Sequence, residues 1–251
     1  MNRVCFVGAG PGDPMLLTLR GAALLKRCRA VFTFPPLDQT FAGLIGDRPV
    51  FDPFDFGFDD LLARLDMLLT EGDVVFLQPG DLTFFSPFQA LIEALGDRAE
   101  VVPGVGVANA ASALLKRTLN LSGSCTRTIL VSTRALAESP GTPSLEDVAR
   151  PGVTLLIYMN HYPLAELVAR LRSGYGCNQP VALVHRVSLP GQRLLIGTLD
   201  DIAGKAQHGP FWGPQGRADL TLIITGEALG ARADRGWWDK RREGGHRHRP
   251  V

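Results

Sequence analysis

The sequence predicts an α/β protein made of two α/β domains. In the first half, short runs rich in β-branched and aromatic residues, typical of buried strands, alternate with stretches whose apolar residues recur at helical spacing. Regular alternation of this kind predicts a mostly parallel sheet with helices on both faces. In the second half, strands and helices follow one another less regularly, which predicts a mixed α/β domain.

Composition limits the classes of function. The chain has 251 residues, of which 45% are hydrophobic and 20% charged, as in globular proteins. The formal net charge of +1 gives no general attraction to nucleic acid, and no apolar segment is long enough to span a membrane. The four cysteines are far apart, so neither a zinc site nor a disulfide framework is predicted. We therefore expect a cytoplasmic protein with no signal peptide, no nucleic-acid or membrane partner and no bound metal.

The predicted elements of the first domain follow one another closely. The clearest is a helix at 59–70, in which five leucines recur on one face before Gly72 ends it. A helix is also predicted at 18–29, and the residues expected to face the sheet from it are Leu19, Ala22, Ala23 and Leu25. The other elements are strands at 3–7, 31–34, 74–78 and 100–102, and helices at 41–45, 86–95 and 107–115.

The strand predicted at 74–78 and the loop after it indicate a binding site. The strand leads into a sharp turn at Pro79-Gly80-Asp81 and then into a helix. Ser86 is predicted as the N-cap of that helix, with Pro87 at its first position and Gln89 completing a capping box. In an open α/β sheet, loops at the carboxyl end of a central strand face the crevice where ligands bind. We interpret this turn as the floor of a small-molecule site; an ordinary strand-to-helix turn is the alternative.

Two further loops have the composition of a ligand-binding surface. Residues 8–14 contain three glycines and two prolines, which lets a ligand or another backbone come close. This loop differs from a dinucleotide fingerprint, which needs Gly where Asp13 stands, and it lacks the Gly-Lys-Ser/Thr ending of a P-loop. At 103–107, small residues precede a helix and leave its first N–H groups free for an acceptor on a ligand.

The chain is expected to divide into a domain at 1–117, a linker at 118–126, a domain at 127–230 and a basic tail at 231–251. The elements of the second domain are strands at 127–133, 154–159, 181–184, 194–197 and 220–225, a helix at 163–172 and a loop at 137–151. The tail holds Trp237 and Trp238 among Arg, Lys and His, and we expect it to be solvated. A flap over a site for an anionic ligand is the alternative.

Several blocks, taken in order along the chain, resemble one known family. Val4-Cys5-Phe6-Val7-Gly8-Ala9-Gly10-Pro11-Gly12-Asp13-Pro14-Met15-Leu16-Leu17-Thr18 looks like the opening signature of the tetrapyrrole methylases, which are C-methyltransferases of cobalamin and sirohaem synthesis. The loop at 80–81, the turn at 102–105, the strand end at 158–159 and the block at 180–186 resemble the remaining motifs, and the similarity extends from Val4 to Leu229. Segments 80–85, 132–134 and 185–192 look most like the branch that methylates precorrin-4 at ring carbon 11.

The resemblance implies a fold, a cofactor and its contacts. The fold is that of the class III methyltransferases: two α/β domains, with S-adenosyl-L-methionine (SAM) in the cleft between them, usually in a homodimer. SAM is converted to S-adenosyl-L-homocysteine (SAH). Many of the family's cofactor contacts are made by main-chain atoms, which suits the Gly and Val residues found here. Carried over by position, the contacts are Pro11, Pro79, Gly80, Asp81, Phe84, Gly106, Val107, Met159, Val187 and Thr221.

The implied substrate is a tetrapyrrole that bears many carboxylates. Arg binds carboxylate through two parallel hydrogen bonds, and Arg134 and Arg186 are the leading candidates for this contact, followed by Arg193 and Arg127. Each could equally be a surface charge. Asp13 is predicted to bind substrate or, alternatively, only to cap its turn. Methyl transfer from a sulfonium needs no metal and no covalent nucleophile, and the pattern assigns no catalytic residue.

The chain also departs from the family pattern. Phe85-Ser86 stands where the family commonly has an aromatic residue followed by Gly, and Gly106 stands where Thr or Ser often follows Pro-Gly-Val. The segments 188–191 and 34–38 also differ from the expected pattern. These departures leave three hypotheses: a precorrin-4 or cobalt-precorrin-4 methyltransferase, a diverged relative with another acceptor, and a protein that binds SAM or a tetrapyrrole without turnover. His185, which follows a predicted strand, is either a proton acceptor or a structural residue.

Overall fold

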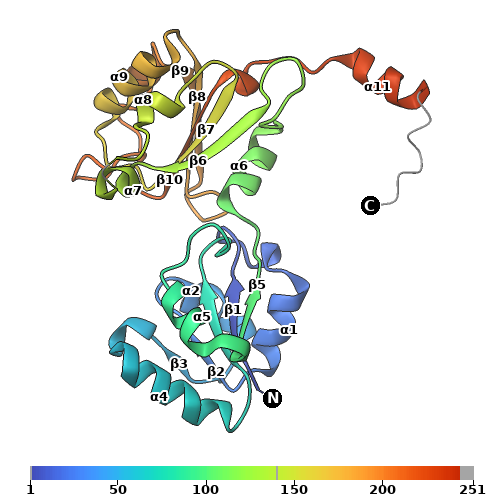
Figure 1. Cartoon of the computed structure of the whole chain (residues 1–251), viewed down its shortest axis with the longest axis vertical. Helices are drawn as coiled ribbons and strands as arrows, with labels where there is room; N and C mark the ends of the chain where they lie inside the picture. The colour runs from blue at the N-terminus through green and yellow to red at the C-terminus, as the bar shows by residue number, and fades with distance from the viewer. Residues whose placement is uncertain (1, 140, 244–251) are drawn as a thin grey trace. The chain divides into compact units, whose positions relative to one another are not determined.

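The computed structural model describes residues 2–139 and 141–243, and for residues 235, 237, 241 and 243 the backbone only. The chain forms two compact units (Figure 1). The first unit runs to Ala111 and also includes Val187–Gly191; the second holds Ser112–Arg186 and the chain from Gln192 on. The predicted linker at 118–126 and the predicted cleft between two domains stay predictions.

The first unit is built on a parallel five-stranded sheet, as predicted. Its strand order is β3-β2-β4-β1-β5, so β4 and β1 are central and neighbouring strands. Every residue of β4 is buried, which agrees with a strand covered on both faces. The strands are β1 (Val4–Gly8), β2 (Ala30–Phe32), β3 (Val50–Phe51), β4 (Val74–Gln78) and β5 (Ala99–Val102).

Helices cover both faces of this sheet. Alternate strand residues pack in two separate cores, one with α1–α3 and one with α4–α5, because successive side chains of a strand point to opposite faces. The helices are α1 (Leu19–Arg27), α2 (Leu37–Thr40), α3 (Ala42–Ile45), α4 (Phe58–Leu69) and α5 (Gln89–Leu95), with 3₁₀ turns η1 (Pro14–Leu16), η2 (Pro53–Asp55) and η3 (Gly96–Arg98). Helix α6 (Val107–Leu115) has its predicted bounds.

The predicted inner face of α1 is wrong in two residues. Leu19 is 91% exposed and Ala23 is exposed, whereas Leu24 and Leu25 are buried. Thr18 is the N-cap, and Gly21 packs so closely on the sheet that a Cβ there would lie 2.8 Å from a methyl carbon of Val7. The helix is therefore rotated so that its smallest residue approaches the sheet.

The predicted capping box at Ser86 is also wrong. Helix α5 begins at Gln89, with Phe88 as its N-cap. The Ser86 hydroxyl donates a hydrogen bond to Gln78 Oε1 (3.0 Å) and accepts one from the Phe88 N–H (3.1 Å). Gln89 bonds to Glu93 within the helix, so it does not reach back to Ser86. Ser86 therefore anchors the loop to the end of β4 instead of capping the helix.

The second unit contains a mixed five-stranded sheet of order β6-β7-β10-β8-β9. Strands β6 and β7 are parallel, and β10 is antiparallel to both β7 and β8. The strands are β6 (Arg127–Ser132), β7 (Val153–Tyr158), β8 (Pro180–His185), β9 (Arg193–Thr198) and β10 (Thr221–Thr225). One core joins this sheet to α8 (Leu145–Val148), α9 (Leu164–Tyr175) and α10 (Ile202–Ala206).

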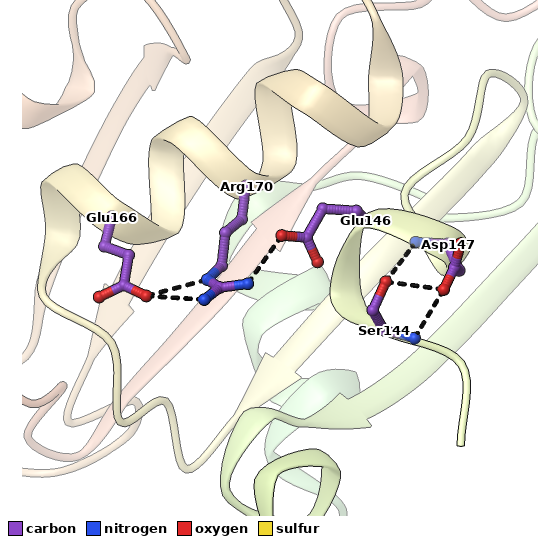
Figure 2. A network of polar contacts seen from close by, with 5 residues as sticks. All are labelled: Ser144, Glu146, Asp147, Glu166 and Arg170. Atoms are coloured by element: carbon purple, nitrogen blue, oxygen red, sulfur yellow. Dashed lines mark hydrogen bonds and ion pairs between the residues drawn. The ribbon is translucent and has the colours of Figure 1, made fainter. Parts of the chain in front are cut away.

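The segment predicted as a loop at 137–151 is partly helical. It takes in the end of α7 (Thr133–Glu138) and all of α8, which Ser144 and Asp147 begin with a reciprocal capping box. Figure 2 shows how Arg170 of α9 lies between Glu166 and Glu146, which connects α9 to α8. Secondary structure beyond β10 comprises the turn η4 (Glu227–Leu229) and α11 (Arg235–Glu243), which lies in the predicted tail. His246 and His248 lie outside the described residues.

Helices long and apolar enough to cross a membrane are absent from the described part of the chain.

Candidate functional site

Three loops meet at the carboxyl edge of the first sheet. They follow β1, β4 and β5, which are neighbouring parallel strands. The N–H of Gly10 donates to the carbonyl of Gly80 (3.1 Å) and the N–H of Gly80 donates to that of Gly10 (2.8 Å), so the first two loops are joined as a short antiparallel bridge. The predicted glycine- and proline-rich bends therefore form one continuous surface.

Glycine at two positions makes this convergence possible. A Cβ on Gly104 would lie 2.3 Å from the carbonyl oxygen of Gly80, and a Cβ on Gly8 would lie 2.6 Å from the N of Gly104. Both distances are below any real contact, so the three backbones approach as closely as chains without side chains can. Gly80 differs, because its φ is +68° and a Cβ there would meet nothing within 4 Å. Its backbone therefore borders open space.

Asp81 holds two of these loops together. Its Oδ1 accepts hydrogen bonds from the N–H groups of Gly104 (3.3 Å) and Thr83 (3.3 Å), and its Oδ2 accepts one from the Thr83 hydroxyl (2.6 Å). A carboxylate has acceptor capacity for further donors. Asp81, which was predicted to contact the cofactor, thus also has a structural role: it connects the loops that follow β4 and β5.

The β8–β9 connection adds a fourth segment to the first unit. The Ser188 hydroxyl accepts a hydrogen bond from the N–H of Asp13 (3.1 Å), and a Cβ on Gly12 would collide with the side chain of Leu189. Val187, predicted to contact the cofactor, is buried beside them. Asp13 Oδ1 accepts from the N–H of Met15 (2.8 Å), which is the turn-capping role considered as the alternative to substrate binding.

The other predicted cofactor residues of the first unit lie in the same three loops. Pro11 follows the Gly10 bridge, Pro79 is exposed, and the Phe84 side chain is 79% exposed. Gly106 and Val107 form the start of α6, whose first N–H groups have no intrahelical acceptor. The arrangement combines backbone donors with an exposed aromatic ring, which suits a ligand that has both polar and flat apolar parts.

The predicted residues of the second unit, apart from Arg127, lie at or next to one end of the strands of its sheet. Strand pairing aligns Ser132 with Tyr158 and places His185 opposite both Thr221 and Arg193. Just beyond this end, three residues other than glycine have left-handed backbone conformations: Met159 (φ +44°), Arg186 (φ +49°) and Leu220 (φ +40°). Such residues cost free energy and gather at functional sites. Leu220 was predicted as the first residue of a strand at 220–225, but β10 begins at Thr221, and the left-handed conformation of Leu220 was not predicted because positive φ in a leucine has no sequence signal.

Buried hydrogen bonds fix the start of β10. His185 is 4% exposed, and its Nδ1 lies 2.8 Å from the carbonyl oxygen of Asp219 and 3.0 Å from Thr221 Oγ1. The Thr221 hydroxyl reaches the carbonyl oxygens of Asp219 (2.7 Å) and Phe211 (3.0 Å). With 6% exposure and an occupied hydroxyl, Thr221 can offer a ligand only main-chain atoms. These contacts favour a structural role for His185 over the alternative role as a proton acceptor.

The four arginine candidates differ in their surroundings. Arg186 Nε is buried and has no hydrogen-bond partner among the described residues. Arg134 is exposed and forms an ion pair with Glu138 (2.9 Å), and Arg193 bonds to the neighbouring carbonyl of Gln192. Arg127 is the first residue of β6 and therefore lies at the opposite end of the strand from Ser132, about 16 Å away. Of the four, only Arg186 has a buried side-chain nitrogen without a partner among the described residues.

No group of three or more His, Cys, Asp or Glu residues that could hold a metal ion occurs within residues 2–139 and 141–243.

Comparison with known proteins agrees with this architecture. The sequence model of the Tetrapyrrole (Corrin/Porphyrin) Methylases matches residues 3–203, which is most of the chain. The chain therefore belongs to the tetrapyrrole methylases. Among its relatives is the precorrin-4 C(11)-methyltransferase of Pseudomonas aeruginosa, which is 33% identical over 91% of each chain.

Two solved structures resemble the fold. A cobalt-precorrin-4 methyltransferase of cobalamin biosynthesis superposes with a TM-score of 0.76 over 91% of this chain and 96% of that chain; at 22% identity it supports the fold alone. The uroporphyrin-III C-methyltransferase of Thermus thermophilus complexed with SAH is 29% identical, with a TM-score of 0.69 over 94% of this chain and 96% of that chain.

Proposed function

We propose that this protein is a SAM-dependent C-methyltransferase of cobalamin biosynthesis, which methylates precorrin-4 or cobalt-precorrin-4 at ring carbon 11. The observation that carries the proposal is the 33% identity, over 91% of both chains, to a precorrin-4 C(11)-methyltransferase. The second support is the solved SAH complex of a relative with 29% identity. The three converging loops and the strained edge of the second sheet supply two surfaces suited to a cofactor and an anionic substrate.

The residues of the first unit fit the cofactor. The space beside Gly80 admits a ligand atom where a side chain would stand, and the start of α6 offers unpaired N–H groups. We assign SAM to Pro11, Pro79, Gly80, Asp81, Phe84, Gly106, Val107 and Val187, together with Met159 and the main chain of Thr221. SAM, when bound, supplies an electrophilic methyl group on a sulfonium centre. The protein's contribution is alignment, because an in-line displacement depends on the orientation of its reactants.

Substrate recognition is assigned to Arg186, with Arg134 and Asp13 as further contacts. The guanidinium of Arg186 has a buried Nε without a partner, and a propionate or acetate carboxylate would satisfy it. Arg134 already pairs with Glu138, so a substrate carboxylate would have to compete with that glutamate. The carboxylate of Asp13 already accepts from the N–H of Met15, and its remaining acceptor sites suit pyrrole N–H groups.

We also infer a cytoplasmic homodimer. The four cysteines are free thiols and three of them are buried, which suits a reducing compartment. The homodimer rests on the family resemblance, and light scattering coupled to gel filtration tests it by the mass in solution.

The direct test is transfer of radiolabel from SAM to precorrin-4. We expect label in the tetrapyrrole, with the new methyl carbon at ring position 11 by NMR. Calorimetry with SAH establishes cofactor binding independently. Confirmed SAH binding with no label in any tetrapyrrole would refute the enzyme and favour a protein that binds without turnover.

Replacing Arg186 tests its assigned role. Arg186→Gln should raise KM for the tetrapyrrole about tenfold or more, because a charge-assisted hydrogen bond is lost, and should change SAH affinity little. Arg134→Gln should have a smaller effect, and the matched control Arg127→Gln, at the opposite end of β6, should have none. Equal losses of tetrapyrrole and SAH binding in Arg186→Gln would contradict the assignment.

The main alternative is that the protein methylates a different tetrapyrrole. The 29% identity to a uroporphyrin-III C-methyltransferase and the departures at Phe85-Ser86 and 188–191 favour it. Offering uroporphyrinogen III and precorrin-4 in parallel separates the two: a higher kcat/KM for uroporphyrinogen III would replace the first assignment.

A further inference from the structure

Leu220 combines two features that are unusual for a residue in a connecting bend. Its φ is +40°, and its side chain is 62% exposed. A left-handed conformation is unfavourable for a side chain with Cβ, and an exposed leucine gains little from burial. Among the described residues the chain places glycine at twelve positive-φ positions, so a leucine here is an exception. Since glycine would be more favourable in this conformation, we look for a function that requires the leucine side chain.

The bend that carries Leu220 is held from both sides. His185 Nδ1 lies 2.8 Å from the carbonyl oxygen of Asp219; since a carbonyl only accepts, this nitrogen carries the proton. The N–H of Asp219 donates to the carbonyl of Phe211 (3.2 Å). On the other side, the carbonyl of Leu220 accepts from the N–H of Arg186 (2.9 Å). These bonds keep the bend in an unfavourable conformation and couple it to Arg186.

We propose that Leu220 is an apolar contact for the tetrapyrrole, presented by a strained bend that His185 holds in place. The inference rests on the proposed function and adds a binding residue and a positioning residue to it. The shared hydrogen bond joins a leucine bend to an arginine bend, and a ligand with carboxylates around an apolar ring matches that pair. Leu220 touches the ring, and His185 acts through the backbone of Asp219.

The test compares Leu220→Gly with Leu220→Ala. Both variants remove the apolar contact, so both should raise KM for precorrin-4 about tenfold with kcat nearly unchanged, as expected when substrate and transition state lose the same contact. Only glycine relieves the backbone strain, and Leu220→Gly should therefore melt about 2–4 °C above Leu220→Ala. Calorimetric affinity for SAH should change less than about twofold in either variant, a shift of under about 0.5 kcal/mol.

Lys116 provides a matched control. Its φ is +52°, it is exposed, and it lies between α6 and β6 in the chain, with no hydrogen bond or ion pair to Arg186 or Leu220 among the described residues. Lys116→Gly should melt above Lys116→Ala, as at Leu220, but both should keep the wild-type KM. A rise in KM in the Lys116 variants would show that relief of strain anywhere disturbs binding, and would overturn the specific role of Leu220.

His185 is tested by two amides. In His185→Asn the side-chain N–H₂ stands where Nδ1 stood and can donate to the carbonyl of Asp219, whereas in His185→Gln the amide is one carbon further out. His185→Asn should keep KM within about threefold of wild type, and His185→Gln should raise it about as much as Leu220→Ala does. An equal KM for both amides would overturn the positioning role.

The outcomes separate this inference from the proposed function. If the wild type methylates no tetrapyrrole, both are overturned. If the wild type is active and the Leu220 variants keep its KM, only the apolar contact is overturned. Weaker SAH binding with an unchanged tetrapyrrole KM would assign Leu220 to the cofactor and also overturn the proposal.

Discussion

Gly104 illustrates how single residues shape the site. A Cβ at this position would lie 2.3 Å from the carbonyl oxygen of Gly80 and 2.8 Å from that of Gly8, and both atoms belong to backbone that cannot simply rotate away. Gly104→Ala should therefore force the three loops apart, lower the free energy of unfolding by about 1–3 kcal/mol and weaken SAH binding. Urea denaturation and calorimetry measure the two effects.

Gly43 is the control for that substitution. It lies in α3, a Cβ there would meet nothing within 4 Å, and no positive φ requires glycine. Gly43→Ala should leave SAH binding unchanged and raise the free energy of unfolding by about 0.5–1 kcal/mol, because alanine is favoured in helices. If Gly104→Ala behaves like Gly43→Ala, the loops do not depend on close backbone contact.

At the residue scale, the sequence indicated in which loop or strand end a residue lies, but it did not indicate the hydrogen-bond partners of that residue. Asp81 and Asp13 were identified as loop residues of the site, but the sequence does not reveal that Asp81 joins two loops or that Asp13 also bonds through its N–H to Ser188. Thr221 was placed at the correct strand end, yet its hydroxyl is occupied by carbonyls. Apart from the carbonyl of Asp219, two residues before Thr221, these partners lie ten or more residues away in sequence, so local patterns do not predict them.

Helices α8 and α9 are connected through Arg170. Its guanidinium contacts Glu166 (2.9 Å) and Glu146 (2.7 Å), as Figure 2 shows. The guanidinium also lies 4.5 Å from the ring centre of Tyr162. The hydrogen bond with Glu166 is the largest cause of a raised pKa for Arg170, and the bond to Glu146 acts in the same direction. Arg170→Met should lower the free energy of unfolding by about 1–2 kcal/mol, since the pair is only partly exposed and Glu146 loses its partner.

Arg134→Met is the matched control at this scale. Arg134 is paired with Glu138 on the same helix, and its side chain is 69% exposed. Removal of an exposed pair of this kind changes stability by about 0.5 kcal/mol or less. Similar losses for the two variants in urea denaturation would contradict a special role for the connection between α8 and α9.

Elements were predicted well where one signal dominated. The five leucines of α4 pack against the sheet, three of them buried, and α6 has its predicted bounds. The start of α5 was wrong, because Ser86 bonds to Gln78, a side chain eight residues earlier, in preference to capping the helix. The face of α1 was wrong because Gly21 packs against Val7. In both cases a tertiary contact outweighed a local preference.

The burial of the thiols gives a prediction for the whole molecule. Burial raises the pKa of Cys5 from 9.0 to about 12 and also raises that of Cys28; Cys125 is buried, and only Cys177 of the four is exposed. Because the thiolate is the reactive form, a disulfide reagent at pH 8 should modify one thiol per native chain, and four in urea. Two or more rapidly reacting thiols would contradict the burial of Cys5, Cys28 and Cys125.

At the same scale, the division of the chain into two domains with a linker at 118–126 stays a prediction. The compact units of the structure are defined by contacts, and the first of them runs to Ala111 and takes in Val187–Gly191. A boundary at a polar stretch is a sensible inference from composition. The β8–β9 connection at Val187–Gly191 belongs to the first unit because of contacts such as that of Leu189 with Gly12, and these residues are far apart in sequence.

The sequence by itself determined the α/β class, the parallel first sheet and the mixed second sheet, because the periodicity of apolar residues is a local property of the chain. The family followed from the ordered blocks that resemble the tetrapyrrole methylases. Only the tertiary structure decided which backbones touch at Gly8, Gly80 and Gly104, which way Ser86 and Thr221 bond, and that Leu220 is held with positive φ. The physical reason is that propensities act between neighbours in sequence, whereas close packing and hydrogen-bond partners are settled between neighbours in space.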